Sequence, residues 1–431
     1  MLQTTIKLDN IAAFKYKALA WANRFPVFLV FDSNNYQQDK YAKYDWELFV
    51  DAIASVTPSE NYFESVAEFQ KQSNEMIVGF FGYECKDEIF KLPAQDHAEK
   101  SLPNCFFFKP RYRFSLKGNT LTINRNYPEA YEMMEQINLQ EEERNPNINP
   151  IIFTELTTKE LYCKNVNHIR QCIENGDFYE LNYCTEVKAK QVTINPISIF
   201  LKLMELSAAP FSVFLKYYNQ YTISASPERF MCKRGNRLIS QPIKGTMRRS
   251  NDDKEDEQFK QALLLSEKER AENVMIVDLV RNDLTPFAIS GSIKVEELFG
   301  IYTFKTVHQM VSTISCELQH EADAIAAMRN AFPMGSMTGA PKFEVIKKIQ
   351  QLEQKPRGLF SGTIGYFDAD GDFDFNVVIR TIFYDAAAKE IVIKTGSAIT
   401  YDSNAADEYE ELALKRAVLL DVLNGRLEVQ G

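Results

Sequence analysis

The sequence is poor in the residues that build common metal and disulfide sites. It has four histidines and no His-Glu-x-x-His segment, which argues against a histidine zinc site. Its seven cysteines are an odd number at scattered positions, without a Cys-x-x-Cys pair. Such cysteines are typical of a reduced, cytosolic protein, in which most of them fill the core. We therefore expect a cytoplasmic protein.

Long apolar runs and positive charge are also scarce. The longest apolar stretches, Phe25–Phe31 and Met76–Tyr83, are far shorter than the about 18 residues of a membrane-spanning helix. The net charge is −10 and there is no long basic run, whereas proteins that hold nucleic acid usually present a basic face. The segment 1–10 also lacks the charged and apolar parts of a secretory signal. We expect neither nucleic acid nor a membrane as a partner.

The chain is long and rich in aromatic side chains. Its 431 residues predict two or three domains or one large layered unit, and 31 Phe with 20 Tyr supply a large core. The polar stretch Gln136–Pro150 is typical of a linker or exposed loop. It divides an N-terminal region, 1–150, from a C-terminal region, 151–431, and we expect both to belong to one compact unit.

Strand and helix patterns follow one another in mixed order, without a regular βαβ rhythm, which predicts an α+β fold. Strand patterns cover Val27–Phe31, Met76–Phe81, Cys105–Phe108, Thr120–Ile123, Phe211–Lys216, Tyr221–Ser224, Arg237–Ile239, Gly362–Phe367, Phe375–Thr381 and Glu390–Lys394. Helical patterns cover Trp46–Ala54, Tyr62–Gln72, Pro196–Glu205, Gln258–Val280, Pro341–Leu352 and Ala406–Leu423.

Two of the predicted helices each carry a pair of carboxylates on one face. Glu269 and Glu272 are three residues apart, and so are Glu408 and Glu411. Carboxylates suit Mg²⁺, which binds one or two of them directly and keeps waters that others can hold. The alternative is that these residues are solvated surface, with Glu411 and Lys415 as an ordinary i,i+4 ion pair.

Three other segments contain residues that could carry chemistry. Lys244 lies in the tight segment Gln241–Thr246, where partial burial would lower its pKa and make it a nucleophile; the alternative is a surface lysine in a turn. The Gly- and Ser-containing loop Phe332–Lys342 leads into a helix whose free N–H groups could receive an anion; the alternative is a plain entry loop. The polar residues of Ala271–Leu284, namely Asp278, Arg281 and Asp283, are best explained as structural.

Taken in order, the chain's segments resemble the chorismate-utilising enzymes, the family of component I of anthranilate synthase and of aminodeoxychorismate synthase, of isochorismate synthase and of salicylate synthase. The resemblance runs from Gly176 to the terminal helix and is weaker before it. Its motifs are SPERF at 226–230, PIKGT at 242–246, AENVMIVDLVRNDL at 271–284, FPMGSMTGAPK at 332–342, SGTIGYF at 361–367, VVIRT at 377–381 and DEYEELALKR at 407–416.

The resemblance implies a fold and a place for the active site. The family fold is a large α+β unit in which two β-sheets pack face to face and helices cover the outside. The active site lies in a cleft between the sheets. The resemblance thus makes region 151–431 the chorismate-binding catalytic domain, and region 1–150 the N-terminal part of an anthranilate synthase component I-like unit.

The resemblance also implies roles for particular residues. Glu272 and Glu411 match the carboxylates that hold Mg²⁺, and Glu269 and Glu408 match their water-mediated partners. Glu228 matches the general acid that protonates the departing 4-hydroxyl of chorismate. The substrate would be bound by Gly245, Thr246, Arg380, Gly396 and Lys415.

Lys244 distinguishes between the members of the family. Anthranilate synthases resemble PIAGT at this place, and aminodeoxychorismate synthases resemble PIKGT. The resemblance to the latter implies that the lysine attacks C2 of chorismate as the 4-hydroxyl leaves, and that ammonia attacks C4 and expels the lysine. The product would be 4-amino-4-deoxychorismate, the precursor of p-aminobenzoate and folate. The alternatives are an anthranilate synthase component I and a catalytically silent module that senses chorismate or tryptophan.

A source of ammonia is not evident in the sequence. No Gly-x-Cys-x-Gly segment, which a glutaminase nucleophile needs, is present, and Cys85 does not fit the pattern. We therefore expect a separate glutamine amidotransferase subunit as partner. Four residues depart from the common family pattern in the substrate region: Glu180, Gln309, Phe360 and Ala398.

Overall fold

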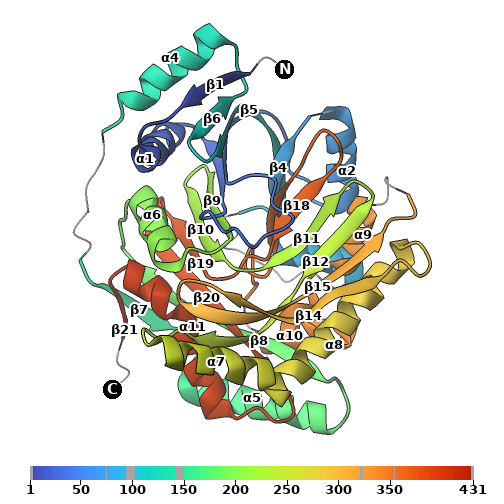
Figure 1. The fold of residues 1–431 in the computed structure, drawn as a ribbon. Coiled ribbons are helices and arrows are strands. Elements are labelled where there is room, and N and C mark those ends of the chain that lie inside the picture. The colour runs from blue at the N-terminus through green and yellow to red at the C-terminus, as the bar shows by residue number, and fades with distance from the viewer. Residues whose placement is uncertain are drawn as a thin grey trace.

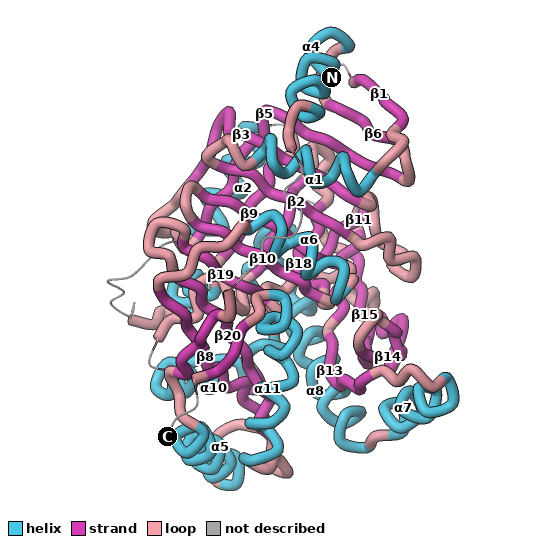
Figure 2. The backbone as a smooth tube through the Cα atoms, turned by 90° about the vertical axis from the view of Figure 1, so that its left-hand side faces the viewer, coloured by secondary structure: helices cyan, strands magenta, loops and turns pink. Residues whose placement is uncertain are grey.

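The structure is a computed structural model that describes residues 3–73, 75–93, 102–141, 149–320, 324–353 and 355–428. Its strands form two large sheets that face each other, and helices cover their outer faces (Figures 1 and 2). The predicted α+β fold with a sandwich-like core is therefore confirmed.

The first sheet runs from the N-terminal strand to strands near the end of the chain. Its strands follow the order β1 (Thr4–Lys7), β6 (Thr120–Ile123), β5 (Cys105–Lys117), β3 (Trp46–Val56), β2 (Val27–Asp32), β9 (Phe211–Tyr217), β10 (Gln220–Ser226), β19 (Thr381–Asp385), β20 (Glu390–Ile399) and β8 (Glu180–Lys190). Strand β8 also pairs with β16 (Gly339–Ala340) and with β7 (Ile151–Glu155), and β7 pairs in parallel with β21 (Gly425–Leu427).

The second sheet begins at the first residues of the long strand β5, Cys105–Phe108. It continues through β4 (Ile77–Phe81), β17 (Thr363–Phe367), β18 (Phe373–Asn376), β11 (Arg229–Arg234), β12 (Arg237–Gln241) and β15 (Val307–Glu317), and β15 also pairs with β13 (Ile243–Arg248) and β14 (Lys294–Thr303). Strand β5 pairs with β4 through Cys105–Phe108 and with β6 through Phe114–Lys117. One long strand thus joins the two sheets.

Aromatic and branched side chains fill the space between the sheets. Strands β2 and β9 contribute Val27, Leu29, Val213 and Leu215, and strands β4, β5 and β17 contribute Val78, Phe80, Phe106, Phe108, Ile364 and Tyr366. Because both faces of these central strands are covered, their sequences are nearly continuous apolar runs.

Helices cover the outer faces of both sheets. The first sheet packs against α1 (Ile11–Ala22), α4 (Tyr127–Asn138), α6 (Pro196–Ser207) and α11 (Ala405–Val422). The second sheet packs against α2 (Tyr62–Ser73), α8 (Glu267–Leu284) and α9 (Ala324–Ala331). Helices α5 (Lys159–Glu174) and α10 (Lys342–Leu352) pack near β8, and α3 (Lys86–Phe90) and α7 (Asp253–Leu265) are peripheral. Figure 1 shows α5, α7 and α8 at the end of the molecule opposite α1, α4 and β1.

Several predicted elements are wrong in type or extent. The segment Trp46–Ala54 is strand β3 rather than a helix, because it pairs with β2 on one side and β5 on the other. The predicted helix Gln258–Val280 is two helices, since Ser266 adopts an extended conformation and its side chain accepts the N–H of Glu269.

Two boundaries near the end of the chain also differ from the predictions. The predicted strand Phe375–Thr381 is the end of β18 and the first residue of β19, and Arg380 between them has a φ of 52°. Pro341 is the residue before α10 rather than its first residue.

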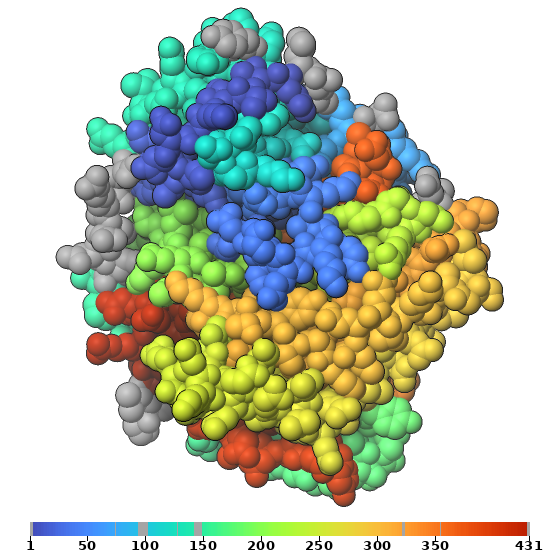
Figure 3. Space-filling view, in the orientation of Figure 1, coloured from blue at the N-terminus to red at the C-terminus, as the bar shows by residue number. Residues whose placement is uncertain are grey.

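The two predicted regions contribute strands to the same sheets. Strand β2 pairs with β9, and β4 pairs with β17. Figure 3 shows residues 33–45, in blue, lying against the orange surface of β14 and β15, where the Tyr41 hydroxyl donates to Glu296 at 2.9 Å. The boundary at residue 150 stays a prediction, and residues 142–148 of the predicted linker lie outside the described residues.

The structure also bears on membrane insertion and on the cysteines. No helix in the described ranges is both long and apolar enough to cross a membrane. All seven cysteines carry free thiols and six of them are buried, as expected of side chains that fill the core.

Two glycines that face each other in the second sheet predict a packing constraint. Gly79 of β4 lies opposite Gly365 of β17, and a Cβ on Gly365 would lie 2.2 Å from the Asp374 carbonyl oxygen and 2.4 Å from the Phe375 ring. We expect G365A to lower the free energy of unfolding, measured in urea, by about 3 kcal/mol. The control G235A adds its Cβ in open space at a φ of 59° and should cost only about 1 kcal/mol. Equal losses in both variants would contradict this reading.

Candidate active site

Ten of the eleven predicted site residues line one cavity of about 510 Å³. The cavity is enclosed by α8, α11, β13 and β20. The ten residues are Glu228, Lys244, Gly245, Thr246, Glu269, Glu272, Arg380, Gly396, Glu411 and Lys415. Residues as far apart in the sequence as Glu228 and Lys415 therefore meet at one place.

Glu408 is the exception among the predicted residues. Its carboxylate accepts hydrogen bonds from the hydroxyls of Ser397 and Ser403, the latter at 2.7 Å, and its side chain is buried. Lys268 at the start of α8 lies 3.9 Å from it. The two serines hold Glu408 behind the cavity wall, and the spacing of carboxylates along the helix gave no sign of them.

Three carboxylates on α8 and α11 face the cavity. Ser266 caps α8, so that Glu269 and Glu272 follow on one face, and Glu411 of α11 lies 2.6 Å from Lys415. Burial, together with the charges of Glu180 and Glu269, raises the pKa of Glu272 to about 7 against the opposing charge of Lys244. The arrangement concentrates negative charge that a cation would stabilise.

This donor set fits Mg²⁺ in its chemistry. Glu272, Glu411 and Glu269 offer only carboxylate oxygens, the ligands that Mg²⁺ prefers. Over the described ranges, however, no three Asp, Glu, His or Cys side chains are gathered closely enough to form a ready-made metal site. The carboxylates line the cavity without converging on one point.

The cavity also carries positive charge suited to an acidic ligand. Burial lowers the pKa of Arg380, whose Nη1 donates to the Lys415 carbonyl oxygen at 3.2 Å. Lys415 Nζ donates to the Gly396 carbonyl oxygen at 2.9 Å in addition to its pairing with Glu411. In the part of the chain that the structure describes, no carboxylate forms an ion pair with Arg380, so its guanidinium can receive a carboxylate of a ligand.

Glu228 is a buried carboxyl group at the edge of this cavity. The Ser336 hydroxyl donates to its Oε1 at 2.6 Å. Burial raises the pKa of Glu228 to about 7, against opposing contributions from Ser336 and from the charge of Lys244. A carboxyl group with this pKa is partly protonated near neutral pH and can act as a general acid.

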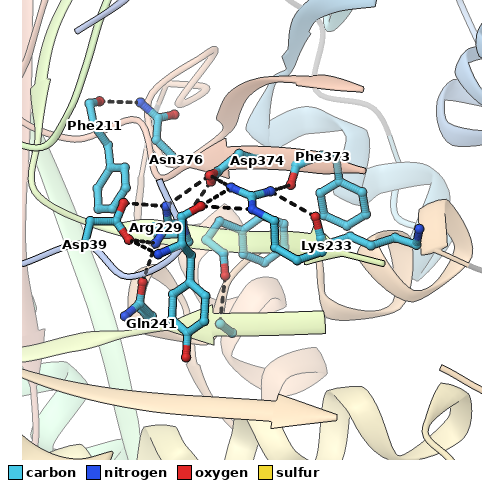
Figure 4. Close-up of polar contacts among 12 residues, drawn as sticks. Asp39, Phe211, Arg229, Lys233, Gln241, Phe373, Asp374 and Asn376 are labelled. Carbon is cyan, nitrogen blue, oxygen red and sulfur yellow. Dashed lines mark hydrogen bonds and ion pairs between the residues drawn. The ribbon is translucent and has the colours of Figure 1, made fainter. Parts of the chain in front are cut away.

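The residue next to Glu228 holds this part of the backbone in place. Arg229, which is 1% exposed, donates to both oxygens of Asp39 at 2.8 and 2.7 Å and to both oxygens of Asp374 at 2.8 and 3.0 Å (Figure 4). The Gln241 side chain accepts from the same guanidinium. The buried guanidinium of Arg229 joins β11 to β18 and to the loop after β2. The N-terminal region therefore helps to position Glu228.

Lys244 is buried and paired, contrary to the alternative of a surface lysine. Its Nζ lies 2.5 Å from Glu180 Oε1, and the two side chains are 7% and 0% exposed. Burial alone would lower the pKa of Lys244, but the charges of Glu180, Glu272 and Glu228 raise it above its ordinary value. The predicted burial is present, and the predicted lowering of the pKa is wrong because Glu180 was not included.

The loop Phe332–Lys342 contacts Glu228 and Glu180, and anion binding at the helix start that follows it stays a prediction. Ser336 donates to Glu228, and Gly339 packs so closely that a Cβ there would lie 2.0 Å from the Glu180 carbonyl oxygen. Lys342 pairs with Asp283 at 2.6 Å, which gives Asp283 the structural role that was predicted. Asp278 and Arg281 form an exposed pair at 2.7 Å.

Sequence reasoning missed three polar residues around Lys244 and Glu228. Glu180 and Ser336 touch these side chains directly, and Asn182 donates to Glu180 at 3.3 Å. The only sequence signal for Glu180 was that it is acidic at a position where the family commonly has an amide side chain. Ser336 is one of several small residues in its loop, and nothing in the sequence distinguishes it.

Comparison with known proteins agrees with this fold. A model of a family described as chorismate binding enzyme matches residues 24–421, and the chain belongs to this family. The chain is 36% identical over 362 residues to an aminodeoxychorismate synthase of Arabidopsis thaliana, covering 78% of this chain and 39% of that protein. It is 38% identical over 254 residues to aminodeoxychorismate synthase component 1 of Escherichia coli strain K12, covering 59% of this chain and 55% of that protein.

A solved structure shares the fold over nearly the whole chain. Anthranilate synthase component I from Streptococcus pneumoniae TIGR4 aligns with a TM-score of 0.75 at 21% identity, and the alignment covers 97% of this chain and 92% of that one. At this identity the likeness concerns the fold alone. The chain spans less than two thirds of the length of the two synthases above.

The environment of Glu228 predicts a stability effect that depends on pH. Its pKa rises from 4.5 to about 7 on folding, so the cost of burying its charge is absent below pH 4.5 and complete above about pH 7. E228Q removes that cost and should gain up to roughly 3 kcal/mol relative to wild type between these limits. Urea unfolding at both ends of this range, with the exposed E344Q as control, measures the difference. A difference that stays constant with pH would contradict the assignment.

Proposed function

We propose that this chain is the chorismate-converting component of an aminodeoxychorismate synthase. It replaces the 4-hydroxyl of chorismate by ammonia and forms 4-amino-4-deoxychorismate, a precursor of p-aminobenzoate and folate. The observation that carries the proposal is a buried lysine, Lys244, lining the same cavity as the buried acid Glu228 and the cation Arg380. The names of the two synthases similar to this chain support it.

Chorismate is a dicarboxylate, and the cavity offers charges to bind it. Arg380 and Lys415 would hold substrate carboxylates, assisted by the backbone near Gly396 and by the contacts of Gly245 and Thr246. The Gln309 amide donates to the Thr246 hydroxyl at 3.5 Å. Fixing both carboxylates would present C2 and C4 of the ring to the two reacting side chains.

Mg²⁺ belongs to this proposal through the carboxylates of α8 and α11. Glu272 and Glu411 would hold the ion, and Glu269 would bind one of its waters. Glu408, expected from the family resemblance to do the same, would support the wall through Ser397. When bound, the ion supplies positive charge that neutralises a ring carboxylate and fixes its position.

Lys244 and Glu228 would share the covalent chemistry. The neutral amine of Lys244 bonds to C2, the two ring double bonds shift by one position, and the C4–O bond breaks. Glu228 gives its proton to the departing oxygen, which leaves as water. Ammonia then bonds to C4, the double bonds return, and the C2–N bond breaks to release the lysine.

Ammonia would come from glutamine through a separate amidotransferase subunit. The printed name "component 1" of the similar Escherichia coli protein is in keeping with a second component. Free ammonium at high concentration should replace the subunit.

Anthranilate synthase component I and a silent sensing module are the rival functions. The fold alone does not separate the first rival, because an anthranilate synthase shares it. Lys244 opposes that rival, which has no use for a nucleophile at this position. Lys244, Glu228 and the carboxylates of α8 and α11 in one cavity oppose the silent module.

The product of the reaction tests the proposal directly. With chorismate, Mg²⁺ and ammonium, we expect an amino-substituted chorismate without pyruvate, identified by mass spectrometry and a pyruvate assay. K244A should lower the rate by about 1,000-fold or more, because it removes the nucleophile. The control K233A removes a buried lysine, 3.6 Å from Asp372 and outside this cavity, and should keep most of the activity. Anthranilate with pyruvate, or no turnover with an amidotransferase present, would contradict the proposal.

The carboxylate set predicts a requirement for Mg²⁺. EDTA should lower the rate by about 100-fold or more, and added Mg²⁺ should restore it. Calorimetry should show Mg²⁺ binding to wild type in the presence of chorismate and a loss of that binding in E272Q. The neighbouring Glu410 is exposed and pairs with Lys159, so E410Q should bind the ion as wild type does. Full activity in EDTA would show that the carboxylates serve another purpose.

A further inference from the structure

Glu180 is a completely buried carboxylate whose only cationic partner within the described residues is the proposed nucleophile. Its Oε1 lies 2.5 Å from Lys244 Nζ, and its Oε2, also buried, has no hydrogen-bond partner among those residues. Asn182 donates to Oε1 at 3.3 Å. Burying a carboxylate with one unpartnered oxygen lowers the stability of the fold. This cost indicates that the charge of Glu180 has a role in the chemistry of the site.

The surroundings single out Glu180 among the acidic groups near Lys244. Glu272 on α8 and Glu228 before β11 also act on the lysine by their charge. Glu269 on α8 lies beside Gly245, where its Oε2 is 2.9 Å from the position of an added Cβ. In the described structure, only Glu180 accepts a hydrogen bond from Lys244 Nζ.

Backbone contacts hold Glu180 at the start of β8. The loop strand β16 pairs with Glu180 and Leu181, the N–H of Tyr179 donates to the Ala340 carbonyl at 2.8 Å, and the N–H of Asn182 donates to that of Thr338 at 2.8 Å. The loop that positions Ser336 against Glu228 therefore also positions Glu180 against Lys244. The same loop therefore positions both the proposed general acid, Glu228, and the ion pair of Lys244 with Glu180.

An ammonium group has no electron pair and cannot attack carbon, so Lys244 must lose a proton before it reacts. Proton transfer within the pair turns a buried carboxylate and ammonium into a carboxylic acid and an amine. Filling the cavity with substrate removes water, and a drier site favours the uncharged pair over the charged one. The acceptor nearest to Nζ is already in hydrogen-bond contact with it.

We propose that Glu180 is the positioning residue of Lys244 and the acceptor of its proton. This inference rests on the proposed function, in which Lys244 Nζ attacks chorismate. An N–H bond of Lys244 breaks, an O–H bond forms on Glu180, and the electron pair stays on nitrogen to bond with C2. When the C2–N bond later breaks, its electron pair returns to nitrogen and the neutral amine takes the proton back from Glu180.

The substitution E180Q tests this role, because glutamine keeps the size and can still accept a hydrogen bond. We expect kcat to fall by about 100-fold near neutral pH, with the KM for chorismate within about threefold of wild type. The remaining rate of E180Q should rise with pH more steeply than that of wild type up to about pH 9, because the lysine proton must pass to solvent. A kcat within about threefold of wild type, or a reduced kcat with a parallel pH profile, would overturn the proposal.

A second variant covers the case in which E180Q does not fold. E180D keeps a carboxylate with a shorter reach, so it should retain more activity than E180Q or E180A and keep the wild-type shape of the pH profile. Thermal unfolding monitors the folded state of each variant. If E180D is as inactive as E180A while remaining folded, the carboxylate is not the proton acceptor.

Acylation of Lys244 tests the pairing without any turnover. Acetic anhydride labels free amines, and peptide mass spectrometry follows Lys244 against the half-exposed Lys159 as internal reference. Removing the charge of Glu180 should move the labelling of Lys244 to lower pH in E180Q. Unchanged labelling would overturn the pairing, whereas a failed product assay with shifted labelling would reject the proposed function and leave the pairing intact.

Discussion

A charged side chain removed from water needs an opposite charge or several hydrogen bonds, and this requirement shapes the whole sandwich. Three buried cations each join segments that are distant in sequence: Arg229 with Asp39 and Asp374, Lys244 with Glu180, and Lys342 with Asp283. Removing one partner would leave an uncompensated charge, which costs about 3–5 kcal/mol in such settings. The pairs thereby fix the positions of β8, β11, β13 and the loop before α10 relative to one another.

The same requirement separates supporting residues from those available for chemistry. Arg229 has all of its donors engaged and serves the structure. Arg380 donates to a carbonyl, Glu228 accepts from a hydroxyl, and neither forms a hydrogen-bonded ion pair in the described residues. These two groups lie in one cavity. There a carboxylate of a dicarboxylate ligand would pair with Arg380, and a leaving hydroxyl would take the proton of Glu228. The geometry therefore suits a reaction that moves protons and charge in a site shielded from water.

The sequence motifs predicted most residues of the site but not the ion pairs and hydrogen bonds that those residues form. PIKGT, SPERF and the glutamates of two helices predicted seven of the ten residues that lie together, because each motif is local and its chemistry is visible in its residue types. The acceptor for Lys244 lies 64 positions away, on a strand that joins the site only through sheet pairing. Glu408 was predicted as a water-mediated partner of the metal, yet its carboxylate accepts from the hydroxyls of Ser397 and Ser403 and does not line the cavity.

The fold class followed from the sequence, whereas some of its elements did not. Trp46–Ala54 has a pattern that fits a helix, and only its pairing with β2 and β5 makes it a strand. Ser266 ends one helix and caps the next, which a continuous apolar pattern conceals. Tertiary pairing and capping are decided by partners that a single segment does not contain.

The central claim is that the amine of Lys244 forms a bond to the substrate. Incubating the chain with chorismate and Mg²⁺ but without ammonia, followed by rapid quenching and mass spectrometry of the intact chain and its peptides, tests it directly. The account predicts an adduct of chorismate less one water on the peptide that contains Lys244, and its loss in K244A. An adduct on another residue, or full turnover by K244A with ammonia present, would contradict it.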